Sequence, residues 1–285
     1  MRRFVIPFLS LIIFWVIFRY GKLIVEGFQY LPHFKTSFFF LSVFSIASLL
    51  ISSIRLWIIV KKIGYELSVV DCFRIYLMSF GALLSSIKFG DSIQIYLLKR
   101  KGLRFSHALL VYSLQRLSDL VTFFLFSLIF LGRRIDLTFF LPLLLFLLVI
   151  KFRARILQRL KKWDRFKRIE EEIEIVKEAL FNLKDCFFIS LLVLSTLGPA
   201  FLGGFALSSL TNTNLIVGIE AVIIFGGGSA AVSPTPLGIG VWEIAVSSFL
   251  ANYIQLPIAL SAVLVYRLFF TFIPAFIGLL LFAWP

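Results

Sequence analysis

The sequence predicts an all-α polytopic membrane protein, and three features lead to this expectation. Hydrophobic residues make up 60% of the 285-residue chain and charged residues only 15%, well below the roughly 25% of a soluble domain. Several apolar runs reach the roughly 20 residues that a helix needs to cross the bilayer core. Breaks rich in glycine, proline and charge interrupt other apolar runs. We therefore expect one integral membrane domain, residues 1–285, with about six full spans and two re-entrant helical hairpins.

The basic residues set the expected orientation in the membrane. The net charge is +14, and cytoplasmic loops carry an excess of lysine and arginine. Arg2 and Arg3 precede the first apolar run, which indicates a retained helix with a cytoplasmic N-terminus. The spans are expected at about residues 1–20, 37–60, 106–131, 135–150, 186–210 and 256–283. This even number places both termini in the cytoplasm, and we expect the cytoplasmic membrane of a prokaryote.

The first expected hairpin covers residues 69–98. Its apolar sequence is interrupted at LLSSIKFGDSI, which contains Lys88, Gly90 and Asp91. Basic residues flank both ends of the segment, so an ordinary span would place one basic group outside, against the positive-inside rule. The segment is therefore expected to enter the membrane and return, with its tip at residues 86–91.

The second expected hairpin covers residues 214–252 and turns within SAAVSPTPLGIGVWEIA. Pro234 and Pro236 each remove a backbone donor and prevent a continuous helix. Gly238 and Gly240 allow a tight backbone turn, and Glu243 follows about one helical turn after this break. Non-helical backbone at membrane depth must be buried in protein or line a wet cavity. The broken segment is thus expected inside the protein, beside a carboxylate.

The most charged part of the chain lies at residues 151–185, between two expected spans. Its first half is basic, with apolar residues at helical spacing, as in a helix that lies on the inner leaflet. The alternative is a solvated linker whose charges only set the topology. The basic excess matches anionic lipid headgroups rather than nucleic acid, because most basic residues lie in short loops.

Five charged residues form the candidate substrate-binding site: Lys88, Asp91, Arg116, Glu243 and Arg267. Each hairpin tip carries a glycine and a nearby carboxylate, and an arginine lies in the span after each hairpin. Paired broken segments in the two halves indicate an inverted-repeat transporter with a site at the midplane. An unpaired carboxylate there costs about 2.5–3.5 kcal/mol, which pairing with an arginine would offset. The alternative is that these residues form structural ion pairs.

Two more charged residues are expected to have other roles. Asp119 lies three residues after Arg116 on the same helical face, so the two are expected to pair with each other. Arg55 lies near the cytoplasmic end of its span, so its side chain is expected to snorkel to the interface.

Enzymatic chemistry finds little support in the sequence. The phosphate-loop pattern G-x-x-x-x-G-K-[ST] is absent, and GGGSAA lacks the nucleophile elbow of a hydrolase. Two cysteines and two histidines, far apart, suggest no metal cluster. We expect no cofactor, no metal and no enzymatic activity; an intramembrane lipid-phosphate enzyme is the weakest of the hypotheses considered.

Four motifs resemble those of a flippase-like membrane family, named for the transmembrane region of lysylphosphatidylglycerol synthases. PTPLGIGVWE is similar to that family's P-x-P-G-G-x-G-x-x-E signature, with Leu237 in place of a glycine. IKFGDSIQ corresponds to P-G-R-x-G-E-x-x-R, QRLSD to E-R-x-x-D, and YRLFFTFIPAFIG to a closing R…P…G helix. The resemblance extends from about residue 40 to residue 280.

The departures from the family motifs lie mainly in the first half of the chain. Lys88 and Asp91 replace arginine and glutamate, Gln94 replaces the final arginine of that motif, and Gln115 replaces the glutamate before Arg116. The resemblance implies translocation of a lipid or a lipid-linked substrate. Family members that make aminoacylated lipids do so with a separate soluble domain, which has no counterpart in this sequence, so we expect no synthase activity.

The sequence thus leads to one functional hypothesis and one alternative. The first is translocation of an anionic phospholipid or lipid-linked intermediate across the membrane, with the headgroup in a polar cavity between the hairpins. The expected partners are membrane lipids and an enzyme that makes the lipid substrate. The alternative is a non-catalytic membrane subunit or scaffold of an envelope lipid or glycan synthesis complex.

Overall fold

The structure is a computed structural model that describes residues 35–83, 87–131, 186–227 and 238–283. These residues form helices and no strand. The α-helices are α2 (Lys35–Lys62), α3 (Val69–Ala82), α4 (Ile87–Arg100), α5 (Phe105–Leu131), α8 (Cys186–Thr211), α9 (Leu215–Glu220), α11 (Val241–Leu250), α12 (Leu256–Arg267) and α13 (Ile273–Ala283). Two π-helices, η4 (Ala221–Gly227) and η6 (Leu268–Phe272), continue α9 and join α12 to α13.

The long helices fall where the sequence predicted spans. Within the described residues, three segments are long and apolar enough to cross a membrane: Phe38–Lys62, Leu191–Thr211 and Leu256–Phe282. Helix α5 matches the span expected at residues 106–131, with a boundary that differs by one residue. The spans expected at residues 1–20 and 135–150, and the charged loop 151–185, lie outside the described residues.

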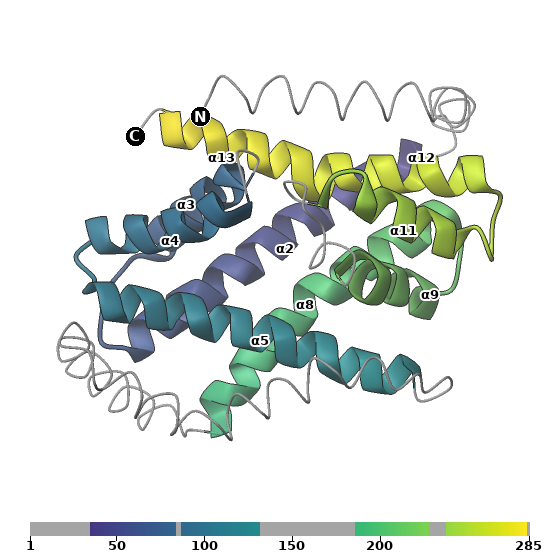
Figure 1. Cartoon of the computed structure of the whole chain (residues 1–285). Helices are drawn as coiled ribbons and strands as arrows, with labels where there is room; N and C mark the ends of the chain where they lie inside the picture. Colours follow the sequence, from purple (N-terminus) through teal and green to yellow (C-terminus); the bar gives the residue numbers. More distant parts are fainter. Residues whose placement is uncertain (1–34, 84–86, 132–185, 228–237, 284–285) are drawn as a thin grey trace, which may run out of the picture.

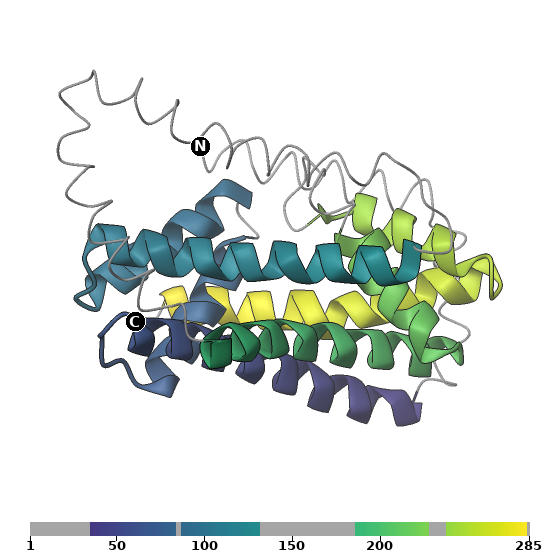
Figure 2. The ribbon, with the colours of Figure 1, turned by 90° about the horizontal axis from the view of Figure 1, so that it is seen from below.

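Helices α2 and α8 pack against each other and run along the lower edge of the described ribbon in Figure 2. Helix α5 packs on both of these helices, while α12 packs on α8 and η6 packs on α2. Helices α3 and α4 gather at one end, and α9 and α11 gather at the opposite end (Figure 1). Helix α3 packs on α2, and α9 packs on α8, so one helix of each short pair contacts one of these two long helices.

Glycines allow the closest helix–helix approaches. A Cβ on Gly278 of α13 would overlap the Leu77 carbonyl of α3, and a Cβ on Gly81 would lie 2.7 Å from the Ala275 oxygen. A Cβ on Gly218 of α9 would similarly overlap the Gly204 carbonyl of α8. Lipid provides no hydrophobic drive between helices, so close packing at small residues is a main source of their association.

Helices α3 and α4 form the first pair of short helices, and their outer ends meet. The Lys101 ammonium lies 2.7 Å from the Asp71 carboxylate, which joins the end of α4 to the start of α3. Ser68 caps α3 by accepting a hydrogen bond from the Asp71 amide. The hydrogen bond from Lys101, and then that from Ser68, lowers the pKa of Asp71. The chain therefore returns to its starting point, as a hairpin requires; its re-entry into the membrane stays a prediction.

One detail of the first hairpin differs from the prediction. Helix α4 begins at Ile87, so Lys88, Gly90 and Asp91 are helical instead of forming a turn at residues 86–91. A glycine costs only about 1 kcal/mol inside a helix, too little to end one that is packed against α3 and α5. The turn expected at residues 86–91 is therefore wrong for residues 87–91, which are helical.

The second pair of short helices is the α9–η4 segment and α11. Gly238 and Gly240 have φ values of 70° and 87°, in the left-handed region that glycine adopts most readily, as the sequence predicted. Helix α11 then begins at Val241 and packs on η4, where Gly226 makes room for the indole of Trp242. Pro234 and Pro236, which the sequence places at the break, lie outside the described residues.

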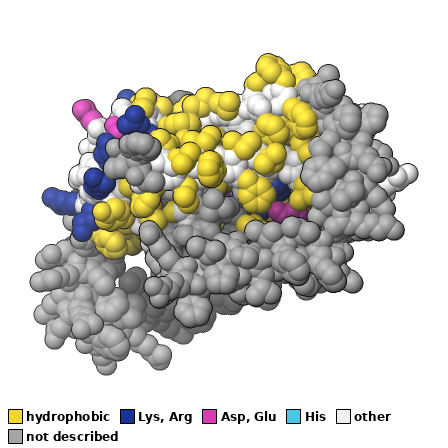
Figure 3. Space-filling view, turned by 90° about the horizontal axis from the view of Figure 1, so that it is seen from above, with side chains coloured by type: hydrophobic (Ala, Val, Ile, Leu, Met, Phe, Trp, Pro, Cys, Tyr) yellow, Lys and Arg dark blue, Asp and Glu magenta, His cyan; other side chains and the backbone are white. Residues whose placement is uncertain are grey.

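The outer surface of the described residues is largely apolar, and charged side chains gather at one end (Figure 3). Phe39, Leu194 and Phe276 are at least 60% exposed, as expected for side chains that face lipid. Figure 3 shows hydrophobic side chains over most of the described part of one face, with Lys and Arg gathered at one end. The ends of α2 and α4 carry Lys61, Lys62, Lys99 and Arg100.

Candidate functional site

A buried ion pair between α11 and α12 forms the first part of the site. The Arg267 Nε donates to Glu243 Oε1 at 2.7 Å, and the two side chains are only 6% and 9% exposed. The second carboxylate oxygen of Glu243 accepts a hydrogen bond from the Gly240 amide at 2.7 Å. Arg267 Nη1 donates to Thr271 Oγ1 at 3.0 Å. Both partners are thus held by further hydrogen bonds, as a buried ion pair requires.

Local sequence explains the position of this pair. Gly240 starts α11, so Glu243 lies in its first turn and reaches back to the Gly240 amide. Arg267 is the last of the 12 residues of α12, about 18 Å from its start at ~1.5 Å per residue. That places the charge near the middle of the 27-residue apolar segment Leu256–Phe282. The π-helix η6 begins immediately after it.

Aromatic rings cover the Arg267 guanidinium. Its Cζ lies 4.9 Å from the centre of the Trp242 ring and 5.4 Å from that of Phe272. Trp242 stacks in turn on Tyr266, at a ring separation of 5.6 Å. These contacts favour the cation electrostatically and fix its direction.

A cavity of about 220 Å³ lies beside Arg267. Three serines of α2 (Ser45, Ser48 and Ser52) line one side of it, and the lining also includes Trp242, Tyr266, Thr271, Tyr76 and Phe80. Ser45 donates through its hydroxyl to the Phe269 carbonyl of η6 at 2.7 Å. Hydroxyl groups, aromatic faces and one guanidinium thus surround a space between membrane helices.

A second cluster of charge centres on Arg55 of α2. Its Nη1 donates to Asp119 Oδ1 at 2.6 Å, to Thr196 Oγ1 at 2.9 Å and to Ser118 Oγ at 3.3 Å. Arg55 is 6% exposed, so the snorkelling predicted from the sequence is wrong. The carboxylate of α5 and the hydroxyl of α8 hold the guanidinium inside the helix bundle, where snorkelling would break three hydrogen bonds.

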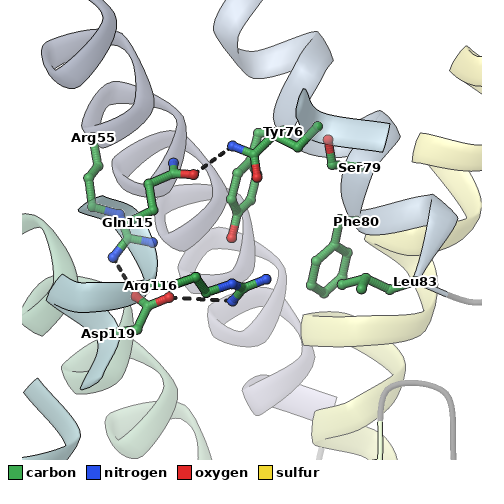
Figure 4. Close-up of a pocket in the computed structure, with 9 residues that line it drawn as sticks. Arg55, Tyr76, Ser79, Phe80, Leu83, Gln115, Arg116 and Asp119 are labelled. Atoms are coloured by element: carbon green, nitrogen blue, oxygen red, sulfur yellow. Dashed lines mark hydrogen bonds and ion pairs between the residues drawn. The ribbon is translucent and has the colours of Figure 1, made fainter. Parts of the chain in front are cut away.

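Arg116 and Asp119 are close, as the sequence predicted, but they do not form an isolated pair. Arg116 Nη1 lies 3.5 Å from Asp119 Oδ2, farther than the Arg55 contact on the other carboxylate oxygen. Arg116 also bonds the Tyr112 hydroxyl through Nε at 2.9 Å, and its side chain is 51% exposed. Asp119 is therefore shared between two arginines, with Arg116 on the more open side (Figure 4).

Two glutamines join α4 to α5 beside this cluster. Gln94 Nε2 donates to Gln115 Oε1 at 2.6 Å, and both side chains are buried. Gln94 stands where its family motif ends in an arginine, and Gln115 stands where its motif begins with a glutamate. The two glutamine side chains are in contact. A pair of uncharged amides therefore lies where the family motifs would place an arginine and a glutamate.

A cavity of about 110 Å³ lies within this second cluster. Figure 4 shows the side chains around it, which come from α2, α3, α4 and α5 and from Leu83 directly after α3. The lining consists of Arg55, Tyr76, Ser79, Phe80, Leu83, Gln94, Gln115, Arg116 and Asp119. Within the described part of the chain, Arg55 Nε and Gln115 Nε2 are buried without a hydrogen-bond partner.

The two cavities share walls from two helices. Ser45, Ser48 and Ser52 of α2 line the larger cavity, and Arg55 lines the smaller one. Their spacing of three, four and three residues places them on one face of the helix. On α3, Tyr76 and Phe80 line both cavities and stack at a ring separation of 6.3 Å. One polar face of α2 therefore runs along both cavities, with an aromatic pair between them.

The structure brings together some of the predicted site residues. Glu243 and Arg267 form the expected pair at one cavity, and Arg116 lines the other. The expected single cavity is thus divided in two, because Tyr76 and Phe80 project between the clusters. The side chains of Lys88 and Asp91 lie outside what the structure describes.

Sequence reasoning missed the polar face of α2 and the glutamine pair. The signal was present, because Ser45, Ser48, Ser52 and Arg55 recur at helical spacing in an otherwise apolar span. The π-helices η4 and η6 have no such signal, since packing decides where an extra residue is inserted into a helix. Among the described residues, no group of three or more His, Cys, Asp or Glu side chains could hold a metal ion.

Comparison with known proteins agrees with the membrane architecture. A search of curated proteins finds no match. The family described as the lysylphosphatidylglycerol synthase TM region matches residues 3–278, nearly the whole chain and more than the four motifs cover. The chain is therefore a membrane protein that belongs to the lysylphosphatidylglycerol synthase TM region family.

Proposed function

We propose that this protein translocates an anionic phospholipid, or a lipid-linked intermediate, from one leaflet to the other. The observation that carries the proposal is the polar face of α2, which lines two cavities inside an apolar helix bundle. Ionisable residues at membrane depth normally face a substrate path or a protein partner. Here Arg55 and Arg267 both line a cavity, and arginine matches phosphate oxygens with its planar fork.

The proposed path keeps the headgroup in protein and the acyl chains in lipid. The headgroup would pass along Ser45, Ser48 and Ser52, whose hydroxyls replace the hydrogen bonds of water. The distance from Ser45 to Arg55 is about 15 Å at ~1.5 Å per residue, roughly half of the ~30 Å hydrocarbon core. Tyr76 and Phe80 would move to connect the two cavities. Glu243 would balance the charge of Arg267 until an anion approaches.

The contacts between helices support a repeat of two halves. Helix α3 packs on α2 as α9 packs on α8, and α4 packs on α5 as α11 packs on α12. The Gln94–Gln115 bond in the first half corresponds to the Glu243–Arg267 bond in the second. We propose that the halves are inverted repeats with re-entrant hairpins, in the cytoplasmic membrane of a prokaryote, with both termini cytoplasmic. An enzyme that makes the lipid substrate is the proposed partner.

The test is translocation of fluorescent anionic lipid in proteoliposomes that contain the purified protein. We expect the wild type to expose inner-leaflet label to an added quencher, and Glu243→Gln and Arg267→Ala to slow this at least tenfold. Asp71→Asn, which alters an exposed ion pair at the end of the hairpin, is the matched control. No translocation by the wild type would contradict the proposal, and full activity in both site variants would remove the assigned residues.

A second candidate function is that of a membrane scaffold, and one observation favours it. Both carboxylate oxygens of Glu243 are already bonded, one to Arg267 and one to the Gly240 amide. A pair so fully bonded can hold α11 to α12 as a structural element. In that case the wild type would translocate no lipid, and a synthesis enzyme would co-purify with it.

A further inference from the structure

The smaller cavity contains two buried donors with no acceptor. Arg55 Nε and Gln115 Nε2 have no hydrogen-bond partner in the described part of the chain, and both residues line the cavity. Arg55 and Gln115 are only 6% and 4% exposed. An unpaired buried polar group costs about 1–3 kcal/mol, and more when it is charged. Two such groups beside one cavity are therefore best explained by something that binds there.

The chemistry of these groups selects an acceptor with negative charge. Both unpaired atoms are N–H donors, so they need a hydrogen-bond acceptor. Two guanidiniums, Arg55 and Arg116, and one carboxylate, Asp119, line the cavity, which leaves one excess positive charge. A water molecule could accept hydrogen bonds from both donors, but it would not neutralise the excess positive charge. A phosphate or similar oxyanion would satisfy both.

The anchoring of each side chain leaves these donors available. Asp119, Ser118 and Thr196 all bind Nη1 of Arg55, which holds the guanidinium in place while Nε stays unbonded. The bond to Gln94 uses the Gln115 carbonyl oxygen, so its amide nitrogen is left over. The site is thus preorganised by α4, α5 and α8 before any ligand enters.

The volume limits what can enter. A cavity of about 150 Å³ holds a benzene molecule, so about 110 Å³ suits a group of a few heavy atoms. A phosphate group fits this description, whereas a whole lipid headgroup does not. Arg116, with its half-exposed side chain, would meet the anion at the open side of the cavity.

We infer that the cavity of Arg55 and Gln115 is a phosphate-binding site, with Gln115 as the uncharged donor that completes it. The inference deepens the proposed translocation, on which it rests for the source of the phosphate. The phosphate is either the phosphodiester of a lipid or a free inorganic ion. In both cases, Arg55 Nε and Gln115 Nε2 bind its oxygens.

The test measures binding to delipidated protein in an uncharged maltoside detergent. The probes are inorganic phosphate and a short-chain phosphatidylglycerol, with chloride at equal ionic strength and short-chain diacylglycerol as phosphate-free controls. Gln115→Glu keeps the shape of the side chain but replaces the donor by a carboxylate, and we expect it to weaken binding at least tenfold. Gln115→Met, which removes the donor together with the acceptor of the Gln94 bond but adds no charge, serves if the charged variant does not fold.

A matched control comes from the same helix. Thr122 also carries a buried polar atom without a partner in the described residues, but it does not line this cavity. Thr122→Val is therefore expected to bind both probes like the wild type. Binding of the lipid alone identifies a headgroup site, and binding of inorganic phosphate identifies a site for the free ion.

Two results would overturn the inference. One is that neither phosphate probe binds the wild type more tightly than its phosphate-free control. The other is that the Gln115 variants and Thr122→Val bind alike. Translocation of labelled lipid is measured on the same preparations. If the wild type binds phosphate but does not translocate lipid, only the proposed function is contradicted. If the wild type translocates lipid and the Gln115 variants change neither translocation nor phosphate binding, only this inference is contradicted.

Discussion

At the scale of single residues, the Glu243–Arg267 pair is the clearest case of charge inside the apolar bundle. Taking either charge out of water costs several kcal/mol, and only good geometry and further hydrogen bonds offset that cost. The structure provides both, through Gly240, Thr271 and the faces of Trp242 and Phe272. The pair is therefore stable while it is complete and costly when one partner is lost.

Replacement of Glu243 by glutamine is predicted to destabilise the protein by about 3–5 kcal/mol, because it leaves the Arg267 charge buried and unpaired. The measurement is denaturant unfolding in detergent micelles. The double variant Glu243→Gln with Arg267→Met is expected to recover most of the loss, since no unpaired charge remains.

The exposed pair at the hairpin end is the control for this prediction. Lys101→Gln removes one partner of the Asp71 ion pair, and the side chains there are 48% and 29% exposed. Exposed pairs contribute about 0–1 kcal/mol, so this variant should unfold almost like the wild type. Equal losses in Glu243→Gln and Lys101→Gln would contradict the burial argument.

At this scale the sequence placed Glu243 about one turn after the backbone break, where the structure has it, and placed the Arg55 side chain at the interface, where the structure does not. Glu243 follows a backbone break in the same segment, so local sequence is enough to place it in the first turn of α11. The partners of Arg55 lie on α5 and α8, 63 to 141 residues away along the chain. Only the packing of these helices decides whether the guanidinium reaches inward or toward the interface.

At the scale of the helices, η6 is held by a bond from another element. A π-helix is rare and often lies at a functional site, and here it directly follows Arg267. Ser45 Oγ of α2 donates to the Phe269 carbonyl within η6 at 2.7 Å. The same serine lines the larger cavity, so this bond links the backbone of η6 to the cavity wall.

Ser45→Ala is predicted to cost about 1 kcal/mol, because the Phe269 carbonyl loses its side-chain donor. Thermal unfolding in micelles measures the change. Ser42→Ala is the matched control, since the Ser42 hydroxyl bonds the Phe38 carbonyl of its own helix and, among the described residues, no other helix. A similar effect of both substitutions would show that the contact with η6 has no special role.

Gly278→Ala is predicted to separate α3 from α13. The expected loss of stability is about 1–3 kcal/mol or more, as for other overpacked sites. The added Cβ would overlap the backbone carbonyl of Leu77, which cannot move aside as a side chain can. Gly227→Ala is the control, because its Cβ would lie 3.7 Å from the Phe123 ring. Unfolding in micelles compares the two, and equal losses would contradict this account.

The contact between the ends of α3 and α4 is predicted to weaken in acid. The hydrogen bonds from Lys101 and Ser68 lower the pKa of Asp71 below its ordinary value of 3.8. A lowered pKa in the folded state means that the stabilisation is present above pH ~3.8 and is lost as the pH falls through the folded value. Spin labels on the two ends should separate in that range. Asp71→Asn should remove this dependence on pH, and an unchanged acid response in that variant would contradict the assignment.

At the scale of the whole molecule, the two ends of the bundle are predicted to face opposite sides of the membrane. Lys101 lies at the basic end of α4 and Gln255 precedes α12, which carries no basic residue at that end. In a Cys72→Ala, Cys186→Ala background, Lys101→Cys should react only with a reagent in the cytoplasm. Gln255→Cys should react from outside. Reaction of both cysteines from one side would contradict the predicted topology.

The sequence alone determined the membrane class, the described spans, the glycine turn before α11 and the Glu243–Arg267 pair. These features depend on composition, on apolar length or on residues within one or two neighbouring helices. Tertiary structure decided the rest: the inward position of Arg55, the contact between Gln94 and Gln115, the two π-helices and the division into two cavities. Each of these depends on which helix faces are turned toward each other, and many faces in this chain are apolar enough to face either protein or lipid.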